Sequence, residues 1–153
     1  MTETMQSFFS DYLNLLRKCH DDIRKTMDGL PPEALDWTPG ANMNSICVLV
    51  YHITGAERFW IGDVAAQEPS NRDRDAEFRV KNLGDEFLRK RLVDSFAYAT
   101  AKLEQLTLQD LETLRTSSRG TFTIGWSLLH ALEHSHLHLG HLQITRQLWD
   151  QRR

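Results

Sequence analysis

Apolar residues recur every three or four positions along four long stretches of the chain, which is the spacing of amphipathic helices. The first stretch ends at Gly29-Leu30-Pro31-Pro32, where glycine frees the backbone and proline removes hydrogen-bond donors. The expected N-caps of the second and fourth helices are short polar residues that directly precede the apolar pattern. The four predicted helices cover roughly residues 4–28, Asn42 or Asn44 to about 66, 83–106, and Thr121 or Thr123 to about Trp149.

The segments between these helices carry polar and turn-forming residues. Residues 31–40 predict an ordered, non-helical connection in which Trp37 packs against the helices. Residues 67–81 are polar and of mixed charge, which predicts a solvated loop and not a binding tract. Residues 107–110 have the capping pattern of a short extra helical turn, and residues 117–120 form a loop. No segment predicts a strand.

This pattern predicts an all-α fold, an antiparallel four-helix bundle with a short extra helical turn between helices three and four. A chain of 153 residues suits one domain, so we expect a single domain over residues 1–153. Apolar residues make up 41% and charged residues 25%, as in ordinary globular proteins. The core between facing helices is where such bundles place metal ions.

Charge and hydropathy narrow the possible partners. The formal net charge is −3 without a basic run, so we expect no nucleic-acid partner. The apolar stretches are too short to cross a membrane, and the N-terminus lacks the pattern of a secretory signal, so we expect a cytoplasmic protein with no membrane partner. Cys19 and Cys47 each fall inside a helical apolar pattern, which predicts two buried free thiols and no disulfide.

Histidines are concentrated in the fourth predicted helix, where five of the seven lie between residues 130 and 141. At about 100° per residue, His130, His134, His138 and His141 share one face, whereas His136 points almost the opposite way. Imidazoles four residues apart on a helix can converge on one metal ion, because their Cβ atoms are about 6 Å apart. Such a pair supplies two ligands, so a third has to come from another helix.

His52 is the candidate for that third ligand. It lies on the apolar stripe of the second helix, so its imidazole faces the interior and needs a partner. The alternative, which spacing alone leaves open, is a set of hydrogen-bonded core histidines. The chain lacks His-Glu-x-x-His and Cys-x-x-Cys, which excludes a zincin protease and a zinc finger, and it lacks a glycine-rich phosphate loop.

Two segments and a loop carry a resemblance to a known family. The segments are residues 45–60, with His52, Glu57 and Trp60, and residues 126–146; the loop is residues 30–37. Together they resemble the DinB-like metal-binding family, which includes YfiT-like proteins and the N-terminal domain type of mycothiol-dependent maleylpyruvate isomerases. Because the resemblance spans nearly the whole chain, it implies a metal-binding bundle with helices in up-down-down-up order.

The resemblance also implies a ligand set. The family has one histidine in the second helix and a His-x-x-x-His pair in the fourth, followed closely by glycine and glutamine, which implies His52, His134 and His138 as metal ligands. His141 stands where many members have glutamine, so its role stays open. His130 could orient a ligand, pack in the core or belong to a shifted ligand set, and we favour one of the first two.

For function, the resemblance implies a divalent zinc or nickel ion, frequent homodimers and, in several members, transfer of a low-molecular-weight thiol. Our leading hypothesis is a metal-dependent transferase that activates such a thiol for a small-molecule substrate. A metal-dependent hydrolase is the first alternative, but neither Glu57 nor Glu133 is predicted to face the metal as a general base. The second alternative is a non-catalytic, stress-associated dimeric bundle.

Overall fold

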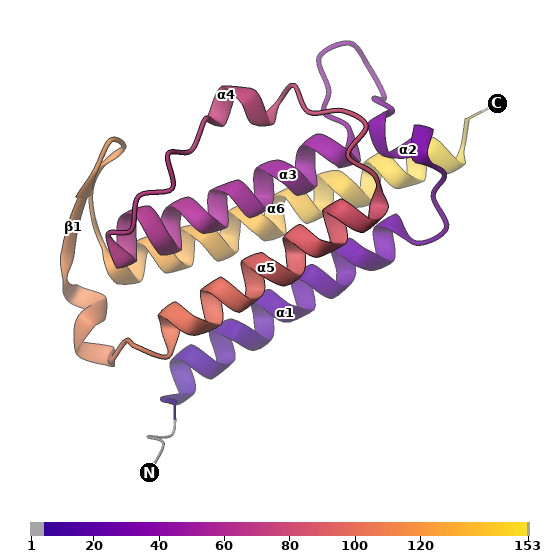
Figure 1. The fold of residues 1–153 in the computed structure, drawn as a ribbon. Helices are drawn as coiled ribbons and strands as arrows, with labels where there is room; N and C mark the ends of the chain where they lie inside the picture. Colours follow the sequence, from indigo (N-terminus) through magenta and orange to yellow (C-terminus); the bar gives the residue numbers. More distant parts are fainter. Residues whose placement is uncertain (1–4, 153) are drawn as a thin grey trace.

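The computed structural model describes residues 5–152, and within them the chain is mostly helical, as expected. The elements in order are α1 (Ser7–Met27), α2 (Pro32–Asp36), α3 (Ile46–Glu57), η1 (Arg58–Ala66), α4 (Arg74–Glu77), α5 (Asp85–Leu103), η2 (Leu108–Glu112), β1 (Leu114–Ser117), β2 (Gly120–Thr123) and α6 (Ile124–Asp150). Helices α1 and α6 run in one direction, whereas α3 and α5 run in the opposite one (Figure 1). Each of α1 and α3 packs along both α5 and α6.

Local signals explain where the long helices begin and end. The α1 helix ends before Gly29, which adopts a positive φ of 71°. Thr123 caps α6 by accepting a hydrogen bond from the Trp126 backbone N–H, and it is one of the two predicted caps. The prediction for α3 was wrong, because Ser45, not an asparagine, accepts from the Val48 N–H. The segment before α3 contains several short polar residues that can cap a helix, and only the backbone geometry decides which of them is the N-cap.

The second predicted helix continues to Ala66, but its last nine residues widen into the π-helix η1. It ends at Gln67, whose backbone is left-handed with a φ of 56°. The short extra turn is present as η2, a 3₁₀-helix in which Thr107 and Asp110 form a reciprocal capping box.

Three predictions about the connections were wrong. Strands β1 and β2 form an antiparallel hairpin, with Leu114 opposite Thr123 and Ser117 opposite Gly120. Strands of four residues are too short to show a clear alternating pattern. Residues 67–81 are not simply a solvated loop, because they include α4 and the buried carboxylate of Glu77. In the connection before α3, Trp37 packs as expected, with its ring 5.7 Å from that of Trp149. The prediction that this connection is non-helical was wrong, because Pro32–Asp36 form α2, where a proline in the first turn loses no helical hydrogen bond.

The core consists of two clusters of buried apolar side chains separated by a polar level. The cluster nearer the hairpin includes Leu16 and Ala131, whereas the cluster nearer α2 includes Cys19 and Leu139. Along α6, the residues between Ala131 and Leu139 therefore pass through the polar level, and this span contains His134 and His138. Between the two clusters, buried polar side chains contact one another, with His20 and Ser135 bonded to Glu57 and His52 close to His134.

Within residues 5–152, none of the helices combines the length and apolar character needed to cross a membrane.

Candidate metal centre

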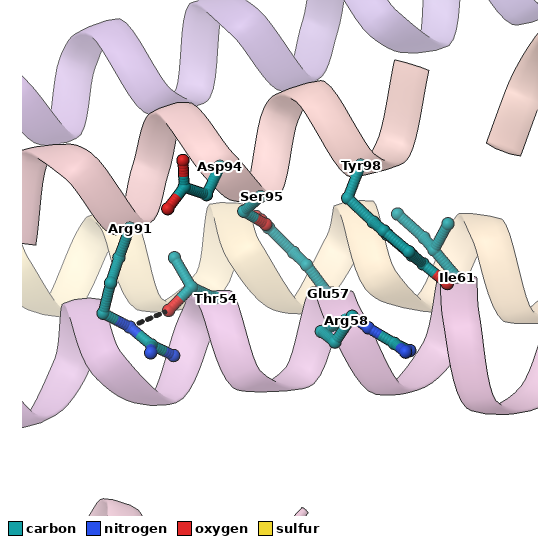
Figure 2. A pocket seen from close by; sticks show the side chains of 8 residues that line it. All are labelled: Thr54, Glu57, Arg58, Ile61, Arg91, Asp94, Ser95 and Tyr98. Atoms are coloured by element: carbon teal, nitrogen blue, oxygen red, sulfur yellow. Dashed lines mark hydrogen bonds between the residues drawn. The ribbon is translucent and has the colours of Figure 1, made fainter. Parts of the chain in front are cut away.

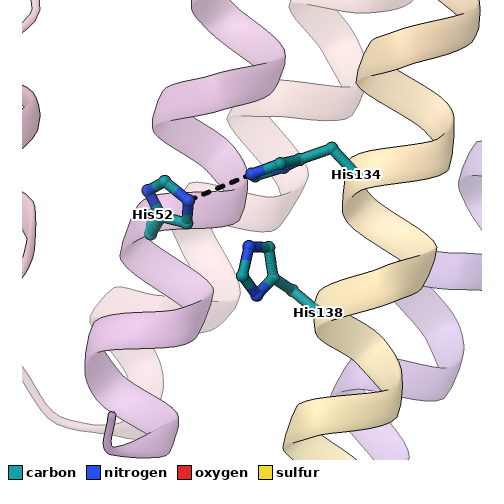
Figure 3. A group of neighbouring side chains, drawn as sticks. All are labelled: His52, His134 and His138. Atoms are coloured by element: carbon teal, nitrogen blue, oxygen red, sulfur yellow. Dashed lines mark hydrogen bonds between the residues drawn. The ribbon is translucent and has the colours of Figure 1, made fainter. Parts of the chain in front are cut away.

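The three histidines implied by the resemblance meet between two facing helices. His52 projects from α3, and His134 and His138 project from successive turns of α6 (Figure 3). One ring nitrogen from each lies within 4.8 Å of the others, and His52 Nε2 is 3.0 Å from His134 Nε2. The ring centroids of His134 and His138 are 4.4 Å apart. The structure therefore assembles a three-histidine group that could hold a metal ion.

The donor set fits a tetrahedral divalent ion with an open position. Zinc–nitrogen distances of about 2.1 Å in tetrahedral geometry separate two ligand nitrogens by about 3.4 Å. The separations in the group run from 3.0 Å to at most 4.8 Å, so they bracket this value. The Nδ1 atom of His134 is buried and has no hydrogen-bond partner among the described residues. Three imidazoles leave room for one further ligand.

Glu77 orients His52 from behind. Its carboxylate is 3% exposed and lies 2.9 Å from His52 Nδ1. Arg72 donates to both carboxylate oxygens at 2.8 Å. Burial by itself raises the pKa of Glu77, but the hydrogen bonds from Arg72 and His52 outweigh burial and hold that pKa below its ordinary value. An ionised Glu77 accepts the Nδ1 proton of His52, so the Nε2 lone pair faces the other two histidines.

The two α6 histidines, His134 and His138, have the neutral form that a metal ligand requires. Burial, together with the neighbouring histidines, lowers the pKa of His134 to about 3. Burial and the charge of nearby basic side chains lower the pKa of His138 to about 4. Both imidazoles are therefore neutral near neutral pH and have a lone pair available.

The structure separates the roles of the other α6 histidines. His141 Nδ1 lies 3.1 Å from His138 Nδ1, so His141 can orient that ring and is not itself in the three-histidine group. His130 stacks on Trp126 with ring centroids 4.8 Å apart and is also outside the group. His136 bonds the Leu132 carbonyl on the exposed side, as its position on the helix predicts.

A cavity of about 160 Å³ lies directly beside the three-histidine group. Two of the group's members form part of its wall, and the other lining residues are aromatic, basic or small. The lining residues are His52, Ala56, Trp60, Arg72, Arg74, Arg119, His130 and His134.

Glu57 belongs to a different polar cluster on the other side of α3. It is 1% exposed, and His20 Nε2 lies 2.9 Å and 3.0 Å from its two oxygens. Ser95 and Ser135 also donate to it. Burial by itself raises the pKa of Glu57, but the charge and hydrogen bond of His20 and the serine hydrogen bonds keep that pKa below its ordinary value.

A second cavity, of about 290 Å³, opens beside Glu57 between α3 and α5 (Figure 2). Glu57 lines this cavity and not the one beside the histidines. The prediction that Glu57 does not serve the metal is therefore consistent with its position.

Both cysteines are buried free thiols, as expected. Burial raises the pKa of Cys19 to about 12 and that of Cys47 to about 11. Neither thiol lines the cavity beside the histidines. They therefore act as core residues.

Sequence reasoning missed Arg72 and Glu77, which lie in the segment expected to be solvated. The sequence feature that could have indicated their burial is a pair of apolar residues, Phe78 and Val80, within that polar segment. Phe78 packs its ring 4.8 Å from the His52 ring, and Val80 packs against the core cluster nearer α2. These two contacts pack the segment against the helices and place Glu77 beside His52.

Comparison with known proteins identifies the family of the chain. The family model of the DinB superfamily matches residues 15–142, which include all three histidines. The chain belongs to the DinB superfamily. None of the curated proteins compared with this DinB superfamily member matches it.

Two solved structures share the fold of this DinB superfamily member. A conserved protein from Enterococcus faecalis has a TM-score of 0.82 at 15% identity, over 97% of this chain and all of the other. A DinB-like protein from Bacillus cereus has a TM-score of 0.74 at 16% identity, over 98% of this chain and 95% of the other. At these identities the likeness shows the fold alone.

Proposed function

We propose that this protein holds a divalent ion, zinc or nickel, with His52, His134 and His138, and transfers a low-molecular-weight thiol to an electrophilic small molecule. The observation that carries the metal site is the convergence of three imidazoles beside a cavity. The fold component of the proposal is a single-domain antiparallel four-helix bundle, supported by the directions of the long helices, of which α1 and α6 run one way and α3 and α5 the other (Figure 1). The transfer reaction rests on the family resemblance and on the chemistry of the cavity.

The chain's residues have distinct tasks in this proposal. The three histidines would hold the ion, two of them in the wall of the cavity, while Glu77 keeps the lone pair of His52 Nε2 available. A divalent ion there supplies Lewis acidity and lowers the pKa of a thiol that reaches it. Trp60 and Ala56 supply the apolar part of the cavity wall.

The thiol has to come from outside the chain. Cys19 and Cys47 are buried and their pKa values are raised, so neither is a nucleophile near neutral pH. In the proposed transfer the small thiol loses its proton to solvent, its sulfur forms a bond to an electrophilic carbon, and the leaving group departs with its electron pair. No covalent intermediate with the protein is needed.

The hydrolase alternative lacks a general base. Within the described chain no acidic residue lines the cavity, and the carboxylate of Glu77 is occupied by Arg72 and His52. Glu57 is bonded to His20 elsewhere in the core. We therefore favour thiol transfer, in which the metal-lowered pKa of the nucleophile replaces a protein base.

Metal content tests the site directly. Wild-type protein, purified without a tag and reconstituted with zinc or nickel, is expected to hold one ion per chain by elemental analysis. A triple His52→Ala, His134→Ala, His138→Ala variant is expected to hold none. The matched control is His136→Ala, which removes an exposed histidine from the same helix and should keep the ion. Equal metal content in all three proteins would refute the site.

The transfer activity is tested on the metal-loaded protein. Loss of free thiol is followed with cysteine, glutathione or coenzyme A in the presence of 1-chloro-2,4-dinitrobenzene as the electrophile. We expect turnover that disappears in the triple variant and persists in His136→Ala. A fully loaded protein without turnover would favour the non-catalytic alternative.

We extend the proposal to a homodimer. Helix α6 carries exposed apolar side chains, among them Leu129 at 56%, Leu137 at 57% and Ile144 at 47% exposure. Association through this helix would bury them against a second copy. Light scattering is expected to show a dimer for the wild type and a monomer for Leu137→Glu; a wild-type monomer would refute this part.

A further inference from the structure

We propose that the cavity beside the three-histidine group binds a small molecule through an anionic group, a carboxylate or a phosphate, held by Arg74 and Arg119. Assigning this molecule as a substrate rests on the proposed function. Binding of the anion itself does not, because both arginines lie outside the three-histidine group.

The charges around the cavity are unbalanced. Of its three arginines, Arg72 is neutralised by the buried carboxylate of Glu77. Arg74 and Arg119 line the same cavity, and within residues 5–152 neither has a carboxylate partner at ion-pair distance. The cavity therefore has two uncompensated positive charges and favours an anion.

Two acidic residues close to the cavity, Asp73 and Glu133, do not themselves line it. Asp73 precedes Arg74, but its carboxylate caps α4 by accepting the Ala76 N–H at 3.0 Å. Glu133 reaches to 3.8 Å from His130 Nδ1, yet its side chain is 75% exposed and does not line the cavity. An anionic ligand consequently meets the arginines without a competing carboxylate in the cavity wall.

The two arginines approach from separate segments. Arg74 begins α4, and its guanidinium lies 5.0 Å over the Phe78 ring, which itself packs 4.8 Å from the His52 ring. Arg119 lies in the turn between β1 and β2. A guanidinium presents paired N–H donors that match the two oxygens of a carboxylate or phosphate. The segments predicted as loops thus supply the recognition groups for the site.

The dimensions restrict the ligand. A volume of about 160 Å³ holds the equivalent of about five waters, so it admits an anionic group and a short carbon segment, with any remainder outside. Trp60 is 8% exposed and stacks edge-on against His130 with ring centroids 4.8 Å apart, which gives the cavity one rigid aromatic wall. The ligand class is therefore a short-chain carboxylate or phosphate compound whose reacting atom points toward the histidines.

The test measures anion binding without metal. Backbone amide resonances of protein freed of metal with a chelator are followed during titration with succinate, with dimethyl succinate as its uncharged counterpart, and with inorganic phosphate. We expect succinate or phosphate, but not dimethyl succinate, to bind, and the preferred anion identifies the group. Each of Arg74→Gln and Arg119→Gln should weaken binding by about tenfold. The control Arg79→Gln, an exposed residue outside the cavity, should bind like the wild type.

The outcomes separate this inference from the proposed function. Unchanged anion binding in the double glutamine variant, equal binding of dimethyl succinate, or no binding of either anion would overturn the inference. Zinc content, measured on the same proteins, should be unaffected by the glutamine substitutions. If the arginines bind succinate but the histidines take up no metal, the inference stands and the proposed function fails.

Discussion

Replacing Gly55 by alanine should weaken metal binding although the added methyl group touches none of the three histidines. Gly55 lies on α3 three residues after His52, and its Cα faces the carboxylate of Glu77. A Cβ at this position would overlap Glu77 Oε2 and lie 2.9 Å from the carboxyl carbon. Carbon atoms in contact prefer about 3.5–4.0 Å, so the carboxylate has to move by about 0.6–1.1 Å.

Such a movement breaks the hydrogen bonds that hold His52. The carboxylate bonds His52 Nδ1 at 2.9 Å and Arg72 at 2.8 Å, and a shift of this size takes at least one of these contacts beyond hydrogen-bond distance. Loss of the group that orients a metal-ligating histidine weakens metal affinity by about 10- to 100-fold. The loss of one charged hydrogen bond lowers the free energy of unfolding by about 1.5–3 kcal/mol. The higher helix propensity of alanine than of glycine offsets about 1 kcal/mol of this loss.

Gly140→Ala is the matched control. Gly140 is also a helical glycine near a ligand, His138, but nothing lies within 4 Å of the position that its Cβ would take. Zinc affinity is measured by competition with a chromophoric chelator, and the free energy of unfolding by urea titration of metal-free protein. We expect Gly55→Ala to bind zinc more weakly and to lower the free energy of unfolding by about 0.5–2 kcal/mol. We expect Gly140→Ala to bind zinc like the wild type and to raise the free energy of unfolding by up to about 1 kcal/mol. Wild-type affinity in Gly55→Ala would refute the orienting role of Glu77.

Three further outcomes follow from other groups. Glu57→Gln breaks a buried ionic contact and should lower the free energy of unfolding by about 3–5 kcal/mol in urea titrations. Folding lowers the pKa of Glu57, so the ionised carboxylate stabilises the folded protein fully near neutral pH, and this contribution is lost as the pH falls through the folded pKa. The melting temperature of Glu57→Gln should therefore depend less on pH in that acid range than the melting temperature of the wild type. Cys19 and Cys47, with pKa values of about 12 and 11, should react with a thiol-specific chromophore only after denaturation, and rapid labelling of native protein would contradict their burial. His141→Ala should weaken zinc affinity by about tenfold through loss of the contact to His138, and an unchanged affinity in the chelator competition would show that His141 does not position its neighbour.

Part of the candidate site could be predicted because helical geometry is local. The face shared by His130, His134 and His138 follows from the rotation of about 100° per residue and needs no tertiary information. The burial of Cys19 follows in the same way from its apolar stripe. The apolar stripe of the second helix made His52 the candidate for the third ligand, but the family resemblance was needed to favour a ligand over a hydrogen-bonded core histidine.

Other features depended on contacts between distant segments. His52 and His134 are 82 residues apart, and their 3.0 Å approach follows from the packing of α3 on α6. The hairpin that presents Arg119 was missed because two four-residue strands gain their stability from pairing, which leaves little periodic trace in the sequence. The backbone, and not residue type, decided that Ser45 caps α3.

The sequence by itself determined the mostly helical character, the approximate extent of the long helices and the histidine face of α6, because each depends on residues within a few turns of one another. Only the tertiary structure decided that Glu77 and Arg72, which lie in a polar segment, are buried behind His52. The same charged residues are compatible with a solvated loop and with a buried ionic network. What distinguishes the two is whether Phe78 and the neighbouring helices enclose the segment, and that is a property of packing.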